Sequence, residues 1–542
     1  MYSNHTMAQV IYNVLACPGK RTKLTLLSSQ CYGFGNLCKR HLFNSSRSTS
    51  KQLMIWRQIS QRSANILSAD QLQRSSIHTR KLLQVYGDEY LWQHRTLSST
   101  STLFFPWHSS PVMTPEQTSE ILQQNAVSVH FEEEPKRNLL QRFDSNQLFS
   151  NKPGEDRRAV AECLFTDGML FGVFDGHGGT ACAQAVSERL FNYIAAEILP
   201  FQLLPQILRQ LKRGELQDLV RWYRHPNEYR LQVTAKLYHD SLVRYVQANL
   251  SVDIVDDDCV ADVLKTAFDR LDKDLSTEAT RAMTEELGIE PVLNAVAGSC
   301  ACVAYLQDRD LYVGNIGDCR AVLGRSMGNG QWDAIRLSVD HNAQNTSEVE
   351  RIKSVHPPDE SATIIKNGRL LAELIPLRAF GNIRFKWTTA MQQRLLRSAI
   401  GFIPPKHFHT PPYLISTPEV MHHRIADDDK FLILASDGLW DMLSCEKAVQ
   451  LVGAHMKSMK ASGPYKPPSS QNLGNIMGNL KERMDILKSL DTNSATHLIR
   501  YALCGVANGF DMNRLAQVLS LPDATARQHR DDMTVIVIYF NS

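Results

Sequence analysis

The chain has 542 residues, of which 43% are hydrophobic and 21% charged, and its formal net charge is +3. These values are typical of globular proteins. A charge so near to balance argues neither for nor against a nucleic acid partner, and none is predicted. No run reaches the roughly 18 consecutive apolar residues that a membrane-spanning helix requires, so no span is predicted either.

The amino-terminal segment is basic, rich in serine and free of acidic residues up to Asp70. This is the composition of a mitochondrial transit peptide, because the inner-membrane potential pulls positive charge inward. The alternative is a disordered basic tail that binds an acidic partner. We favour import, and assign residues 1–105 to a transit peptide and disordered leader and residues 106–542 to the folded domain.

Short apolar runs alternate with turn residues and helical stretches from Thr114 onward. The Asp-Gly pair at 167–168 lies between two apolar runs, which is a hairpin signal. The expected elements are a helix at 115–124 with Thr114 as N-cap, strands at 161–165 and 169–174, a helix at 180–197, strands at 299–306, 311–316 and 320–323, a strand at 430–435, a helix from 445, a loop at 461–475 and a strand at 534–540.

Residues 200–285 are helical in pattern and carry no glycine-rich loop or chemistry-bearing cluster, so they are predicted to be a helical insertion. The remaining order consists of strand pairs with helices between them, rather than regular alternation of strand and helix. That order favours an α+β fold in which antiparallel sheets are covered by helices. It counts against a Rossmann-type fold.

Three apolar strands carry a carboxylate at one end. Asp175 follows the strand at 169–174, Asp437 follows the strand at 430–435, and Asp531 precedes the last strand. A carboxylate beside a buried strand is costly unless it is paired or bound to a cation. Each one singly is most often a turn or a helix cap. The three together, with Glu155–Asp156 upstream, favour a common cation site.

The candidate ligands are all oxygen donors, which suit Mg²⁺ or Mn²⁺ and disfavour zinc. Gly176 has no side chain, so its carbonyl can approach an ion closely. Two ions in such a cluster would lower the pKa of a shared water and hold phosphoryl oxygens. His177 follows directly and could protonate a leaving alkoxide, although a lone histidine could equally be structural. The residues thus predict a dinuclear hydrolytic site.

Five segments resemble, in order, the signature of the metal-dependent protein phosphatase (PPM) family. The resemblance extends over about residues 140–540 and implies a β-sandwich of two antiparallel sheets flanked by α-helices. Residues 106–542 would then form a PPM-type catalytic domain. The five segments are Glu155–Asp156, Asp175–Gly179, Gly314–Arg320, Ala435–Asp441 and Arg530–Thr534.

The resemblance also implies roles for individual residues around two Mg²⁺ or Mn²⁺ ions in each active site. Asp175 would bridge the two ions, and Asp318 and Asp441 match positions linked to a third, weaker ion. The implied metal ligands are Asp175, Gly176 through its carbonyl, Asp437, Asp531, Glu155 largely through water, Asp318 and Asp441.

Further segments resemble the mitochondrial pyruvate dehydrogenase phosphatases within this family, among them Phe143–Leu148, Gln184–Phe191 and Asp340–Asn345. This resemblance implies dephosphorylation and reactivation of the phosphorylated E1α subunit in the mitochondrial matrix. It also implies docking to the E2 lipoyl domain, promoted by Ca²⁺ at that interface, and a regulatory subunit. The alternatives are another matrix substrate, such as a branched-chain dehydrogenase, or an inactive phosphatase that binds E2 as a scaffold.

Two positions depart from the family pattern. Many members carry an arginine that grips phosphate four residues before the glutamate, and this chain has Asn151 there. The family usually has aspartate after the Arg-Ala-Phe-Gly segment, and this chain has Asn382. The second departure removes a charge near the site, so we expect it to weaken metal affinity without removing an essential ligand.

Overall fold

The computed structural model describes residues 112–131, 139–228, 232–250, 259–282, 288–396, 404–462, 477, 491–504 and 511–541. The predicted leader (1–105) lies outside the described residues. So does the predicted loop at 461–475, apart from its first two residues, which end a helix.

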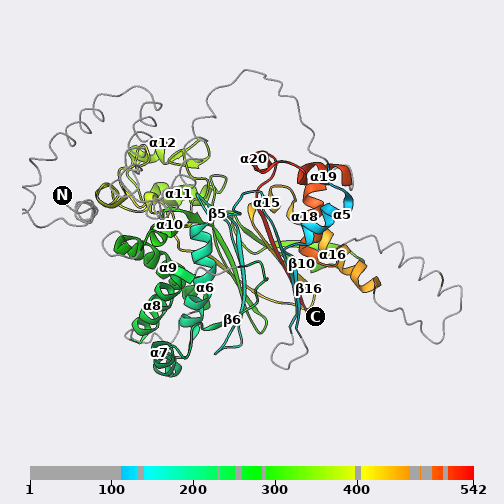
Figure 1. Cartoon of the computed structure of the whole chain (residues 1–542), viewed down its shortest axis with the longest axis horizontal. Coiled ribbons are helices and arrows are strands. Elements are labelled where there is room, and N and C mark those ends of the chain that lie inside the picture. Colours follow the sequence, from blue (N-terminus) through cyan, green and yellow to red (C-terminus); the bar gives the residue numbers. More distant parts are fainter. Residues whose placement is uncertain are drawn as a thin grey trace, which may run out of the picture. The chain divides into compact units, whose positions relative to one another are not determined.

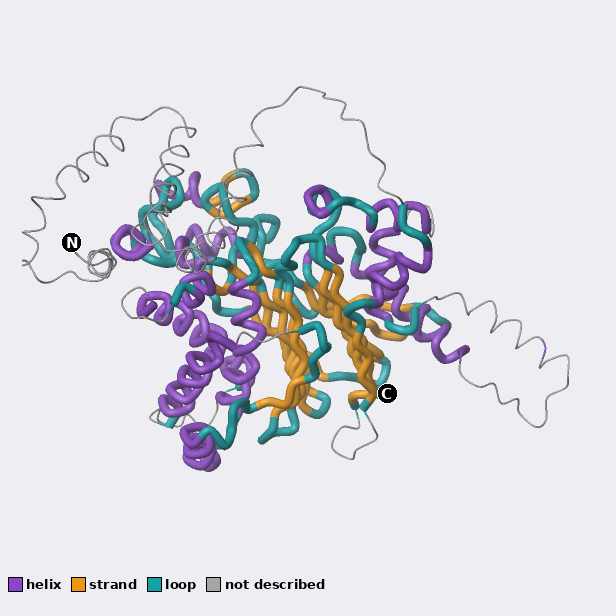
Figure 2. Tube along the Cα trace, in the orientation of Figure 1, coloured by secondary structure: helices purple, strands orange, loops and turns teal. Residues whose placement is uncertain are grey.

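Two six-stranded antiparallel sheets make up the centre of the described domain (Figures 1 and 2). Sheet A has the order β1 (Val127–His130), β2 (Leu140–Leu148), β17 (Met533–Phe540), β16 (Asp429–Ala435), β10 (Arg320–Ser326) and β11 (Trp332–Arg336). Sheet B has the order β15 (Glu419–Arg424), β9 (Asp310–Ile316), β8 (Ala301–Gln307), β4 (Met169–Phe174), β3 (Arg157–Cys163) and β6 (Val220–Trp222).

The two sheets bury a shared apolar core. Alternate side chains of a strand point to one face, so β2 contributes Phe143 and β4 contributes Phe171 to the same layer. Their ring centroids lie 5.8 Å apart with the rings edge to face. Each fully buried side chain of this size contributes about 1.5–3 kcal/mol of transfer free energy, so this layer holds the sandwich together.

Helices cover the outer side of each sheet, as Figures 1 and 2 show. This arrangement confirms the predicted α+β sandwich. Sheet B is covered by α6 (Ala181–Ile198), α7 (Leu204–Arg213), α8 (Gln232–Asn249), α9 (Val260–Ala282) and α10 (Glu290–Val296). Sheet A is covered by α5 (Pro115–Gln123), α15 (Asp437–Trp440), α16 (Cys445–Ser462), α18 (Ser494–Cys504) and α19 (Met512–Leu519), with α20 (Asp523–Ala526) after them.

Both predicted hairpins are present, as β3–β4 and β8–β9, and Thr114 caps α5. The structure differs at several points: β3 (Arg157–Cys163) begins earlier than predicted, β1, β2, β11 and β15 were not expected, and two further differences concern the topology. The strand β6 lies within the range predicted to be helical and pairs with β3 at the edge of sheet B. The strand β10 follows the β8–β9 hairpin in sequence but belongs to sheet A, because the turn at Gly317 (φ 82°) carries the chain across the sandwich.

The segment between β11 and β15 builds its own small apolar cluster and one short sheet. It contains α11 (Thr346–Ser354), α12 (Ser361–Ile364), β12 (Ile365–Lys366), β13 (Arg369–Leu370), β14 (Phe380–Gly381) and α13 (Thr389–Met391). The strand β14 pairs with β7 (Gly298–Ser299), which pairs with β5 (Gly176–His177). This three-stranded sheet brings residues near 380 against the predicted site. None of the described helices has the length and apolarity to cross a membrane.

Candidate metal centre

Three carboxylates from different strand ends meet in one cluster. Asp175 joins β4 to β5, Asp318 follows β9, and Asp437 begins α15 directly after β16. One oxygen of each lies within 4.8 Å of the others. Because β4 and β9 belong to sheet B and β16 to sheet A, the cluster joins the two sheets at one end of the sandwich.

The cluster is electrostatically costly without a cation. Burial, followed by repulsion from Asp318 and Asp531, raises the pKa of Asp437 to about 8. Burial also raises the pKa of Asp318 to about 6, and that of Asp175 well above its usual range, where the Asp437 charge adds to the effect. Like charges this close disfavour ionisation. Divalent cations would remove that cost, and the donor set is all oxygen.

Glu155 lies beside the cluster and has one oxygen without a hydrogen bond in the described structure. Its Oε1 accepts from the Gly179 N–H at 2.8 Å, whereas the buried Oε2 finds no donor. Burial raises the pKa of Glu155 to about 6. A Cβ at Gly176 would come 2.4 Å from the Glu155 carbonyl oxygen, so only glycine fits between the two strand ends.

The remaining predicted ligands, Asp531 and Asp441, surround the cluster. Asp531 lies two residues before β17, and its negative charge contributes to the raised pKa of both Asp437 and Asp441. Asp441 follows α15, and its charge in turn acts on Asp318. The structure therefore brings Asp318, predicted for a peripheral third ion, into the central group with Asp175 and Asp437.

His177 is held by the residue that departs from the family pattern. Its Nε2 lies 2.7 Å from Asn382 Oδ1. Asn382 adopts the left-handed conformation (φ 49°), which asparagine tolerates better than most residues. A Cβ at Gly298, on the intervening strand β7, would lie 2.1 Å from both side chains. Burial lowers the pKa of His177, and the Lys386 charge lowers it further.

Two acids beside predicted ligands have a different, structural role. Asp532 Oδ1 accepts from the N–H groups of Ser150 and Asn151, and Oδ2 from those of Glu155 and Asp156, at 2.6–3.4 Å. The buried Asp156 accepts a hydrogen bond from Ser436 Oγ at 2.7 Å. In the sequence these acids appear only as the second members of the pairs Glu155–Asp156 and Asp531–Asp532. The pairing of two acids is the one sequence feature that indicates a role for them.

Replacing Asp532 with alanine should destabilise the fold by about 3 kcal/mol or more, because four backbone donors lose their acceptor. Urea unfolding of the metal-free protein would measure the loss. Asp523→Ala, at an exposed carboxylate on α20, is the control and should change the free energy of unfolding little. Equal stability of Asp532→Ala and wild type would contradict the structural role.

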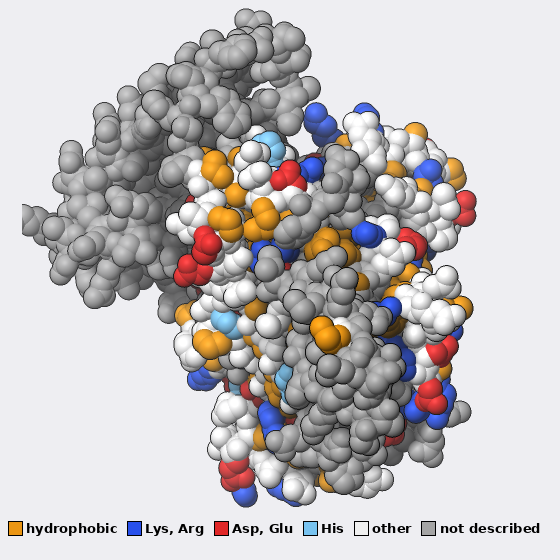
Figure 3. Space-filling view, turned by 90° about the vertical axis from the view of Figure 1, so that its right-hand side faces the viewer, with side chains coloured by type: hydrophobic (Ala, Val, Ile, Leu, Met, Phe, Trp, Pro, Cys, Tyr) orange, Lys and Arg blue, Asp and Glu red, His pale blue; other side chains and the backbone are white. Residues whose placement is uncertain are grey.

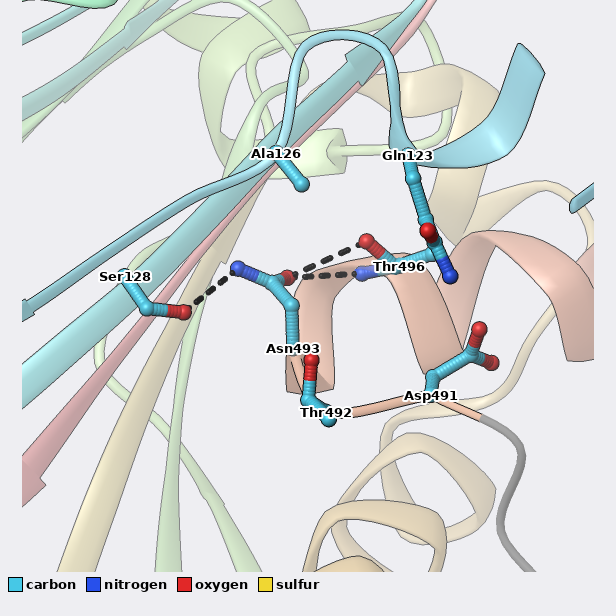
Figure 4. Close-up of a pocket in the computed structure, with 7 residues that line it drawn as sticks. All are labelled: Gln123, Ala126, Ser128, Asp491, Thr492, Asn493 and Thr496. Atoms are coloured by element: carbon cyan, nitrogen blue, oxygen red, sulfur yellow. Dashed lines mark hydrogen bonds between the residues drawn. The ribbon is translucent and has the colours of Figure 1, made fainter. Parts of the chain in front are cut away.

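One cavity in the described part of the chain contains none of the predicted site residues. It has a volume of about 240 Å³ and lies between β1 and the start of α18 (Figure 4). Asn493, in its wall, bonds to Ser128 and Thr496, so its polar groups are satisfied within the fold. On the face in Figure 3, basic side chains are interspersed with acidic and neutral ones.

The comparisons with known proteins identify the family. The family model described as Protein phosphatase 2C matches residues 231–472. Human mitochondrial pyruvate dehydrogenase (acetyl-transferring) phosphatase 1 is 43% identical over 84% of this chain and 87% of its own length. Human mitochondrial pyruvate dehydrogenase (acetyl-transferring) phosphatase 2 is 41% identical over 79% of this chain and 84% of its own length. The corresponding phosphatase 1 of Saccharomyces cerevisiae is 27% identical over 74% of this chain and 68% of its own length. The chain therefore belongs to the metal-dependent protein phosphatase 2C family, in the group of the mitochondrial pyruvate dehydrogenase phosphatases.

Proposed function

We propose that this protein is a serine/threonine phosphatase that dephosphorylates, and thereby reactivates, the E1α subunit of the pyruvate dehydrogenase complex. The observation that carries the proposal is the convergence of Asp175, Asp318 and Asp437, and their raised pKa values support a site that favours cations. The phosphatase relatives, similar along most of the chain, supply the reaction and the substrate class.

The carboxylates would hold two Mg²⁺ or Mn²⁺ ions, with Asp175 between them and Asp437 and Asp531 on one of them. Glu155 and the Gly176 carbonyl would serve the other, and Asp318 with Asp441 a third. When bound, the ions supply an activated water and neutralise phosphoryl charge. Of the chain's own groups, Glu155 Oε2 accepts no hydrogen bond in the described structure and would accept one from a water.

His177 would donate a proton to the serine oxygen that leaves. Its Nε2 is engaged with Asn382 Oδ1, so Nδ1 is the nitrogen left to carry that proton. Position matters as much as acidity, because proton transfer requires hydrogen-bond distance to the leaving oxygen. The short β5–β7–β14 sheet fixes the ring through Asn382.

Asn382→Asp should move the alkaline limb of the kcat–pH profile to higher pH by about one unit. A carboxylate beside the imidazole favours its charged form, so His177 would keep its proton longer. The pH dependence of kcat on a phosphopeptide measures the shift. Asn329→Asp, at an exposed turn position, is a suitable control, and an unmoved limb in Asn382→Asp would exclude His177 as the acid.

The location and partners follow from the same proposal. The leader at 1–105, which is free of acidic residues up to Asp70, would direct import, and residues 106–542 would work as the catalytic domain in the matrix. The E2 lipoyl domain would bring the enzyme to E1α, with Ca²⁺ bound at that interface, since the chain carries no EF-hand pattern of its own. A regulatory subunit would join this assembly.

Release of phosphate from purified phospho-E1α tests the proposal, with phosphorylated branched-chain E1 as the competing substrate. We expect faster turnover of pyruvate dehydrogenase E1α, dependent on Mg²⁺ or Mn²⁺ and stimulated by E2 with Ca²⁺. Equal or faster turnover of the branched-chain substrate would refute the substrate assignment. Binding to E2 without any hydrolysis would instead support the scaffold alternative.

A further inference from the structure

A half-exposed arginine lies at the rim of the carboxylate cluster. Arg527 ends α20, and its Nη2 lies 3.4 Å from Glu155 Oε2. Its side chain is 54% exposed, whereas that of Glu155 is only 11% exposed. The guanidinium thus contacts a predicted metal ligand on one side and is open to solvent on the other.

The donors of Arg527 are not used by the described fold. The contact with Glu155 is an ion pair without hydrogen-bond geometry, since Oε2 has no hydrogen-bond partner. Neighbouring arginines differ. Arg157 donates to the carbonyls of Gly154 and Asp156, and Arg530 donates to Phe149 O and Ser150 Oγ. Arg157 and Arg530 thus each use guanidinium donors to hold the loop at residues 149–156, although the Nε of Arg530 has no partner.

The segment that carries Arg527 is fixed to the loop that carries Glu155. Lys152 and Asp523, whose side chains are both exposed, form a weak surface ion pair at 2.9 Å between the two segments. Arg530 bonds to Phe149 and Ser150 on that loop, and Asp532 binds four of its backbone N–H groups. Arg527 lies between these anchors, so its base is held while its head remains accessible.

We propose that Arg527 binds the phosphate group of the phosphoserine substrate at the entrance of the metal centre. A phosphate dianion approaching several carboxylates requires positive charge beyond that of the bound ions, and a guanidinium offers two parallel donors that match phosphate oxygens. Asn151, on the same loop as Glu155, is uncharged and cannot supply that positive charge. The proposal rests on the proposed phosphatase function, because it assigns the contact that the substrate makes there.

The competing role for Arg527 is to hold Glu155 in place as a metal ligand. The two roles predict opposite effects on metal affinity. A cation next to a ligand repels metal ions, so removing a phosphate-binding arginine should leave Mn²⁺ affinity unchanged or increase it. Removing an arginine that positions Glu155 should weaken Mn²⁺ binding.

Calorimetric measurement of phosphate and Mn²⁺ binding to Arg527→Ala and Arg527→Gln distinguishes the two roles. Inorganic phosphate is titrated into Mg²⁺-saturated protein, and Mn²⁺ into metal-free protein. We expect the phosphate Kd to rise about tenfold, the Mn²⁺ Kd to stay equal or fall, and KM for a phosphopeptide to rise more than kcat falls. Arg221→Ala is the matched control, since that side chain is 65% exposed and pairs with Glu162 at 3.6 Å.

A phosphate Kd changed by less than about threefold in both variants would overturn the proposal. So would a weakened Mn²⁺ affinity together with a phosphate affinity that returns to the wild-type value once metal is saturating. Thermal unfolding of the variants checks that each is folded. Hydrolysis of phospho-E1α by the same wild-type preparation reports on the proposed function independently, so a failure of one proposal is distinguishable from a failure of the other.

Discussion

Asp175→Asn should reduce hydrolysis at least about a thousandfold, equivalent to about 4 kcal/mol of transition-state stabilisation, and yet make the metal-free protein more stable. Asp175 lies within 4.8 Å of two other carboxylates, and burial together with the Asp437 charge raises its pKa. An amide of the same shape removes one of the repelling charges and can still donate to Asp437. It cannot serve as a bridging anionic ligand between two cations.

Two measurements on one preparation test this expectation. Phosphate release from phospho-E1α gives the rate, and thermal unfolding with EDTA or with Mn²⁺ gives the stability. Wild type should gain stability with Mn²⁺, since a ligand that binds only the native state stabilises it, and Asp175→Asn should lose most of that gain. Asp333→Asn, at an exposed position on β11, should resemble wild type. An active Asp175→Asn would refute the catalytic assignment.

The sandwich and the central acids could be predicted from the sequence because both follow from local patterns. Apolar runs of strand length identified β4, β16 and β17. If these strands pack together, the carboxylates at their ends can meet at one end of the sandwich. The turn residues Asp167 and Gly168 fixed the β3–β4 hairpin in the same local way.

Other parts of the site depend on contacts between distant segments, which no local pattern encodes. Asp532 organises a loop more than 370 residues earlier in the chain. The pairing of β5, β7 and β14 brings Asn382 to His177 across 205 residues. In the sequence Asn382 is only a missing charge, whereas its left-handed backbone and its hydrogen bond to the histidine are visible only in the three-dimensional structure.

The stability of the metal-free protein should fall as the pH rises from about 6.5 to 8. Asp437 has its folded pKa raised to about 8, and those of Asp175 and Asp156 are raised well above the usual range. A carboxyl group with a raised folded pKa binds its proton more tightly in the folded state than in the unfolded state. Its contribution is complete below the unfolded pKa and is lost as the pH rises through the folded value.

The lower limit of that window comes from the buried histidines. The pKa values of His177, His341, His356 and His455 are lowered, so the unfolded chain takes up their protons first as the pH falls below about 6.5. Below about pH 6.5 the effect of these histidines on stability opposes that of the carboxylates, and above this pH it vanishes. Between pH 6.5 and 8 the acidic cluster should therefore determine the slope.

Thermal unfolding in EDTA across this window, repeated with saturating Mn²⁺, measures the effect. Bound cations displace the protons from the carboxylates, so the melting temperature should fall with pH in EDTA and lose that fall, or reverse it, with Mn²⁺. Asp437→Asn should flatten the EDTA slope because it removes one of the titrating groups. A metal-free protein whose stability rises with pH in this range would mean that the carboxylates are ionised without a cation, which would contradict a site that depends on metal for its charge balance.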